Sequence, residues 1–323
     1  PSLKTPTRLS DVPAKKKDKA DQSSDKELLL RIRDRFKVMS EADQTNRRKA
    51  LEDLRFLHQP GEQWDANQRK ERGERPCYEF NKTRVTVKRI VNDMRANRPQ
   101  GKVRAVEDGD KDTADIYEGL CRNIWNTSDG DSVIDNAAEY QVGGGMGAWR
   151  VETKYLSDKS FNQDIVVSPI KNPFCLYGDP AASDPLKRDG ADWILTERIS
   201  KASYEARWPN AEVTSFDDVE FDDEEQWTDD EMVRICEYWY KVPETQRIYL
   251  TQDGRVVSEE DAQKIPDQLA LDPIKGTPRM REVQGHCIYM CIASGDAVLE
   301  GPTRWAGSQF PFVVVYGEWT RSE

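Results

Sequence analysis

A basic amphipathic stretch between residues 61 and 104 constrains the fold of this chain more than any other part of its sequence. Asn81 stands before a run of apolar residues at helical spacing, and its side chain can accept a backbone N–H that the first helical turn leaves unpaired. Pro99 ends the run, because proline has no N–H to donate and disfavours helix in the residue before it. The apolar positions are Val87, Ile90, Val91 and Met94. The sequence therefore predicts a helix that follows Asn81 and stops before Pro99, with one apolar side.

Basic side chains flank this apolar stripe. They are Lys82, Arg84, Lys88, Arg89, Arg95 and Arg98. A surface helix with a solvated basic face would account for them. The other interpretation is a face that contacts a neighbouring subunit or DNA, so these six residues are candidates for a subunit interface or a DNA-proximal surface.

The segment that leads into this helix opens with a Gly-Glu-Gln-Trp turn and continues through a charged connector to an Arg-Pro pair. We expect Trp64, a large aromatic residue close to the glycine, to be buried against the 81–97 helix and to anchor the turn. The residues predicted to hold the whole stretch in place are Gly61, Gln63, Trp64, Arg75, Pro76, Asn81, Asn97, Arg98 and Pro99.

The net charge of −11 hides a division along the chain. Residues 1–104 carry 27 Lys and Arg against 16 Asp and Glu, a net charge of +11, and the remaining residues carry −22. Such asymmetry favours electrostatic matching between subunits or with nucleic acid. Two ordinary solvated surfaces of opposite sign would produce the same numbers.

The first two thirds of the chain predict an α+β region at residues 25–216. Residues 1–24 hold too few apolar side chains to order alone, so we expect an arm that is disordered or ordered by a partner. Residues 25–58 have apolar residues at helical spacing, and Ser40 can restart the helix after a break. Two further helices, capped by Asp112 and Asp131, precede a hairpin at about residues 148–170.

An acidic run of ten Asp and Glu residues at 217–231 marks the next boundary and predicts a solvated linker. Residues 232–301 then alternate like a sheet, with a first hairpin about Pro243, and predict a small α+β module with its own core. Its residues expected to be protected from solvent are Val233, Ile235, Tyr249, Ile288, Met290 and Ile292. The alternative is that these strands join the main sheet. Residues 302–323 would begin a further strand or stem region that is incomplete.

No catalytic, metal or cofactor site is predicted. The two histidines are far apart in the chain, and the six cysteines are scattered rather than paired at metal-binding spacings. A two-metal nuclease site needs carboxylates on a rigid scaffold, which an acidic loop does not provide. No run approaches the length of a membrane span, and no signal-peptide pattern opens the chain, so we expect cytosolic synthesis and no membrane partner.

The order of these pieces resembles the portal protein, or head-to-tail connector, of short-tailed double-stranded DNA phages of the Salmonella type. The resemblance covers roughly residues 25–320, and its strength lies in the ordered series rather than in any single motif. The series is Phe56, Gly61-Glu-Gln-Trp64, Arg75-Pro76, Phe80-Asn81, Asn97-Arg98-Pro99, Tyr140–Glu152, Asp179-Pro180, Asp184 and Phe310-Pro311-Phe312.

This resemblance implies a portal-like fold with helical wing and stem elements, β-hairpins and residues 232–301 as a clip-like module that meets the packaging motor and tail. It implies a structural, non-enzymatic subunit of a twelve-fold homo-oligomeric ring at the capsid vertex of the virion, assembled in the host cytoplasm. Double-stranded DNA would pass through the ring during packaging and ejection. The implied protein partners are the large terminase subunit, tail adaptor proteins, capsid protein and scaffolding protein.

Two alternatives remain open at the level of sequence. One is a nucleic-acid-binding protein that uses the basic 82–104 segment, which would need that face to be free and to bind DNA in a salt-dependent manner. The other is a different virion or tail adaptor protein, which would not show the ordered series from the Gly-Glu-Gln-Trp turn to the Asn-Arg-Pro end.

Overall fold

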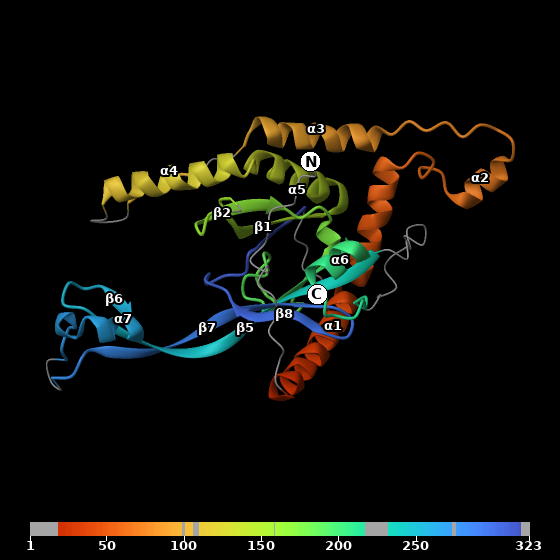
Figure 1. Ribbon diagram of the computed structural model, residues 1–323. Helices are drawn as coiled ribbons and strands as arrows, with labels where there is room; N and C mark the ends of the chain where they lie inside the picture. Colours follow the sequence, from red (N-terminus) through yellow and green to blue (C-terminus); the bar gives the residue numbers. More distant parts are fainter. Residues whose placement is uncertain are drawn as a thin grey trace.

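The computed structural model describes residues 19–98, 101–105, 110–157, 159–216, 232–272 and 276–317. The acidic linker predicted at 217–231, the predicted helix end at Pro99 and most of the arm predicted at 1–24 lie outside these residues. Helices and antiparallel sheets together confirm the α+β prediction (Figure 1). The helices and 3-10 turns are α1 (Lys19–His58), α2 (Ala66–Arg72), α3 (Lys82–Ala96), α4 (Lys111–Thr127), α5 (Gly130–Gly144), η1 (Pro173–Cys175), α6 (Lys201–Arg207), α7 (Glu259–Lys264) and η2 (Pro266–Gln268). The strands are β1 (Met146–Tyr155), β2 (Gln163–Pro169), β3 (Leu176–Gly178), β4 (Asp192–Ser200), β5 (Met232–Leu250), β6 (Val256–Ser258), β7 (Met280–Ala293), β8 (Val298–Arg304) and β9 (Phe312–Tyr316).

Helix α1 is continuous over 40 residues, so the predicted break at Ser40 is wrong. The Ser40 hydroxyl donates to the carbonyl of Lys37 at 3.0 Å instead of capping a new helix. Phe36 and Met39 are buried just before it, and the packing of this face keeps the helix running through the position. Tertiary contact therefore outweighs the local capping signal.

A six-stranded sheet with the order β3-β4-β5-β7-β8, to which β6 adds at β5, forms the centre of the molecule. The first half of β5, up to Tyr240, is buried on both faces, as expected for alternating side chains of a central strand. Cys236 and Tyr238 pack with α1, whereas Trp239 packs with the smaller sheet. Arg35 of α1 binds Asp192 at 2.7 Å and so fixes the helix to the start of β4.

A three-stranded sheet with the order β2-β1-β9 packs against the large sheet, and α5 covers its outer side. The helix and β1 approach closely: a Cβ at Gly147 would lie 2.0 Å from the carbonyl oxygen of Ala137. Helices α3 and α4 contact α5 and form the outermost layer (Figure 1). The predicted hairpin at 148–170 is confirmed by β1 and β2.

The first hairpin predicted at Pro243 is wrong, because β5 runs straight through this proline for 19 residues. Pro243 pairs with His286 of β7, while β4 pairs with β5 no further than Tyr240 and β6 begins to pair at Ile248. At Pro243 the strand therefore has one neighbour, and a proline, which cannot donate, is tolerated at such an open edge.

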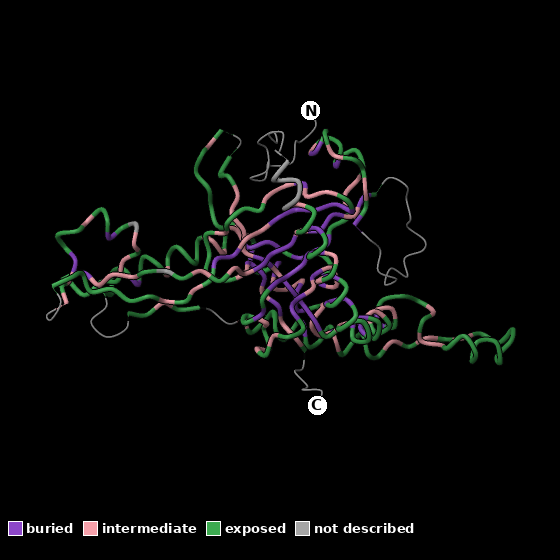
Figure 2. Tube along the Cα trace, turned by 90° about the horizontal axis from the view of Figure 1, so that it is seen from below, coloured by how far each residue is buried: buried purple, intermediate pink, exposed green. Residues whose placement is uncertain are grey.

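The prediction that residues 232–301 pack separately is also corrected. The proximal halves of β5 and β7 belong to the same sheet as β3 and β4, and their buried side chains contact residues from 25–216. The distal halves project from the body with β6 and α7 at their tip (Figure 1). Figure 2 shows buried residues gathered in the body and mostly exposed residues along this projection. The alternative, strands that join the main sheet, describes the proximal part.

Candidate functional site

The basic segment predicted between Asn81 and Pro99 forms α3, which packs on α5 and on the end of α1. The side-chain Oδ1 of Asn81 accepts the backbone N–H of Arg84 at 2.8 Å, which confirms the predicted N-cap. Its amide nitrogen donates to the carbonyls of Phe56 and Leu57 at 3.2 and 3.1 Å. One side chain therefore starts α3 and holds it to the end of α1. At the other end, the Asn97 amide donates to the carbonyl of Asp93 at 3.1 Å.

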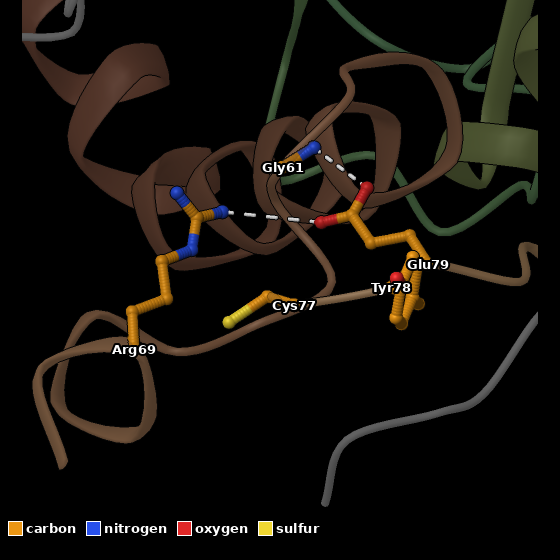
Figure 3. Close-up of a pocket in the computed structure, with 5 residues that line it drawn as sticks. All are labelled: Gly61, Arg69, Cys77, Tyr78 and Glu79. Atoms are coloured by element: carbon orange, nitrogen blue, oxygen red, sulfur yellow. Dashed lines mark hydrogen bonds and ion pairs between the residues drawn. The ribbon is translucent and has the colours of Figure 1, made fainter. Parts of the chain in front are cut away.

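The turn at Gly61 forms a hollow with residues 77–79 of the segment before α3 (Figure 3). Gly61 has a φ of 96°, a left-handed conformation that suits glycine, and its N–H donates to Glu79 at 2.7 Å. The other carboxylate oxygen of Glu79 lies 4.0 Å from Arg69. The charged groups of the hollow thus face one another, which supports an architectural role for Gly61.

Trp64 is half-buried, so the prediction of a fully buried anchor is wrong. Its indole N–H donates to the carbonyl of Tyr78 at 3.1 Å, and the guanidinium of Arg72 lies 4.9 Å from the ring centre. The contacts described are therefore within the connector rather than with α3. Gln63 is also half-buried, whereas Arg75 and Pro76 are exposed, although the Pro76 carbonyl accepts from Arg72 at 3.2 Å.

Two of the six basic candidates form ion pairs with α5. Arg98 binds Asp131 at 2.6 Å and Asp135 at 2.8 Å, and Arg95 lies 3.2 Å from Asp135 and 3.0 Å from Glu139. A hydrogen bond from the Trp125 indole N–H and the contact with Arg98 lower the pKa of Asp131. These acidic partners were not predicted, because no local pattern links residue 98 to residues 131–139.

The other four basic candidates, Lys82, Arg84, Lys88 and Arg89, are exposed and form no ion pair within the described part of the chain. Apolar side chains are exposed on the same helix and on α4. They are Val85, Ile90 and Met94 on α3, and Ile116, Tyr117 and Leu120 on α4. On α3 only Val91 of the predicted apolar stripe is fully buried. The outer helical layer thus presents unpaired cations together with uncovered apolar surface.

The residues predicted to be protected in the 232–301 module are mostly core. Val233, Ile235, Ile288 and Ile292 are buried, and Tyr249 and Met290 are half-buried. Val233, Ile235 and Ile292 pack with α6, and Ile288 packs with the small sheet. These four side chains hold the base of the projecting hairpin, whereas Tyr249 pairs with Val257 of β6 and Met280 of β7 near its tip.

A buried ion-pair network that sequence reasoning missed joins the two sheets. Arg150 of β1 binds Glu152 at 2.7 Å and reaches across to Glu237 of β5 at 3.1 Å. Burial alone would lower the pKa of Arg150, but the two carboxylates raise it above its usual value. The alternating polarity of β1 was visible in the sequence, whereas the partner 87 residues away was not.

The described residues contain no group of three or more His, Cys, Asp or Glu side chains placed to hold a metal ion. Among the same residues, no helix has the length and apolar character that a membrane span requires.

Comparison with known proteins places the chain in one family. A sequence model of the phage P22-like portal protein family matches residues 33–323. A portal protein of Acyrthosiphon pisum secondary endosymbiont phage 1 is 27% identical over 292 residues, which is 84% of this chain and 40% of that protein. The chain therefore spans about two fifths of the length of this relative. Because the family match extends over most of the chain, the chain belongs to the phage P22-like portal protein family.

Proposed function

We propose that this chain is the portal subunit of a phage virion, or a large part of one: a structural protein that forms a homo-oligomeric ring at the capsid vertex. The observation that carries the proposal is the family match over residues 33–323, supported by the portal protein that is 27% identical. The ring is a conduit for double-stranded DNA during packaging and ejection. It is assembled in the host cytoplasm with twelve-fold symmetry, as the resemblance implies.

The chain's own surface supports assembly. Its first 104 residues carry +11 and the remainder −22, so each copy offers both signs of charge to its neighbours. Exposed cations and apolar side chains on α3 and α4 are the kind of surface that an assembled protein covers. A net acidic subunit also suits a DNA channel, since each Lys–phosphate contact adds salt-dependent affinity that would slow translocation.

The projecting tip of β5 and β7 is the part that we assign to contacts with other proteins of the particle. It stands away from the body and carries β6 and α7 (Figure 1). Its partners are the packaging motor, that is the large terminase subunit, and the tail adaptor proteins. Contacts with capsid and scaffolding proteins belong to other surfaces of the ring.

The test is the assembly state of the purified protein. Negative-stain images and native mass spectrometry should show closed rings, and association should weaken as salt is raised, because exposed charge pairs are screened. A monodisperse monomer under all protein and salt concentrations would contradict the proposal.

A further inference from the structure

Helices α3 and α4 of the outer layer lie end to end along one edge of the molecule (Figure 1). Residues 82–98, which include α3, hold six Lys and Arg against one acid. Helix α4 holds three acids, Asp112, Asp115 and Glu118, against Lys111 and Arg122, and Glu118 is paired with Arg122 at 2.8 Å. Helix α5 contacts both α3 and α4, so it holds them in this arrangement.

The outward face of α3 is basic with an apolar centre. Lys82, Val85 and Arg89 follow one another at i, i+3 and i+7 and so share one side of the helix. This side lies opposite Val91, which is 2% exposed and faces the body, whereas Val85 is 69% exposed. Neither Lys82 nor Arg89 has an ion-pair partner in the described part of the chain.

Helix α4 has the complementary surface. Ile116 and Leu120, one turn apart, are 70% and 49% exposed, and Tyr117 beside them is 56% exposed. Asp112 and Asp115 are exposed on the same helix and form no ion pair among the described residues. An amphipathic helix that leaves its apolar ridge uncovered by the described residues favours a partner that covers it.

We propose that α4 of one copy packs on the outward face of α3 of the next copy, with its acids against Lys82 and Arg89 and its apolar ridge against Val85. This inference rests on the proposed function as a ring subunit. The face of α3 has unpaired cations and α4 has unpaired acids, and both expose apolar side chains. The two surfaces cannot meet within one copy because α5 holds the helices end to end. A contact between two different surfaces of identical chains is head-to-tail, and repetition of it closes a ring when the rotation permits.

A second copy fits this face better than DNA does. Arg95 of α3 and Arg98 just beyond its end already bind carboxylates of α5, at 2.6 to 3.2 Å, so this segment and an acidic helix are compatible neighbours. A phosphate backbone would leave the apolar ridge of α4 uncovered and would be repelled by Asp112 and Asp115.

The test is charge reversal on each side and then on both. The first variant is Lys82→Glu with Arg89→Glu, the second is Asp112→Lys with Asp115→Lys, and the third combines all four substitutions. Each single-side variant should weaken self-association about ten-fold or more, since it places like charges opposite one another. The combined variant should recover association to within about three-fold of the parent chain. Sedimentation velocity at fixed salt measures association, and circular dichroism checks that the helices persist.

A matched control reverses two exposed lysines elsewhere, Lys49→Glu on α1 with Lys201→Glu on α6, for the same change in net charge. It should leave association unchanged. Rings that are insensitive to the α3 and α4 reversals, or a combined variant that recovers nothing, would overturn this interface and leave the portal function standing. An α3 reversal that changes only the salt-dependent binding of a double-stranded DNA fragment would assign the face to DNA instead. A parent chain that never associates would overturn both proposals.

Discussion

Replacing Arg150 with methionine should be among the most damaging single changes in the body of this protein. The guanidinium lies between the two sheets, with its side chain 10% exposed, and it binds Glu152 on its own strand and Glu237 on the large sheet. The side chains of these carboxylates are 17% and 15% exposed. Methionine keeps much of the volume but removes the charge.

The expected loss of stability depends on which partners Glu152 and Glu237 keep once the guanidinium is gone. Lys154 still contacts Glu152 at 2.8 Å, so that carboxylate keeps a cation. Glu237 keeps the indole N–H of Trp239 at 3.1 Å and loses its guanidinium. Removing one partner of a buried pair typically costs about 3–5 kcal/mol, because the other charge stays buried without compensation. With one of the two carboxylates still paired, we expect Arg150→Met to lower the free energy of unfolding by about 3 kcal/mol, the lower end of that range.

The assay is urea unfolding followed by tryptophan fluorescence, with the double variant Arg150→Met, Glu237→Gln to complete the cycle. Neutralising Glu237 should recover about 1–2 kcal/mol, a coupling typical of residues in one network. Arg247→Met is the control, because Arg247 is 49% exposed in its pairs with Glu259 and Glu282, and it should cost much less stability than Arg150→Met. A loss below about 1 kcal/mol for Arg150→Met, or no recovery in the double variant, would refute the reasoning.

Two further changes test other parts of the structure. Asn81→Ala removes both the N-cap of α3 and the side-chain amide bonds to the end of α1, and it should lower the free energy of unfolding in urea by about 1–2 kcal/mol. The control is Asn97→Ala, which loses a single exposed hydrogen bond. Equal losses of stability in the two variants would contradict the role of Asn81 in linking α3 to α1. Acid should destabilise the protein through Glu152: burial alone would raise the pKa of this carboxyl, but Arg150, Lys154 and Ser168 lower it. A pKa depressed in the folded state contributes stability above the unfolded pKa, and this contribution is lost as the pH falls through the folded pKa. Unfolding free energies measured from pH 7 to pH 3 should therefore fall, less steeply in Glu152→Gln than in the parent chain; parallel curves would exclude this carboxyl as a contributor.

Local signals in the sequence predicted local structure well. The cap predicted at Asn81 is confirmed. The hydroxyls of Ser200 and Ser258 cap α6 and α7 in the same way, each accepting a backbone N–H three residues ahead. These interactions lie within a few residues, so the neighbouring sequence contains all that is needed to form them. The caps expected at Asp112 and Asp131 were misplaced by two residues: Asp110 caps α4, and Asp129 precedes α5 in a left-handed conformation without a side-chain cap.

Interactions between distant segments could not be predicted in the same way. Spacing alone marked Ile90 and Val91 as parts of one apolar stripe, but the position of α5 decides that Val91 is buried and Ile90 is exposed. Pro243 favoured a turn, yet the long pairing between β5 and β7 carries the strand through it where one edge is open. Trp64 is half-buried because its connector lies away from the main core, which no feature of its own turn reveals.

The sequence by itself thus determined the family, through the order of its motifs, the α+β class and the division of charge between the first 104 residues and the rest. The tertiary structure decided which surfaces remain for partners. It joined residues 232–301 to the central sheet, paired Arg98 with Asp131 and Asp135, and left Lys82, Arg89 and the ridge of α4 exposed. The physical reason is range: a cap or turn is fixed by neighbours along the chain, whereas burial and ion pairing depend on which distant element arrives to cover a face.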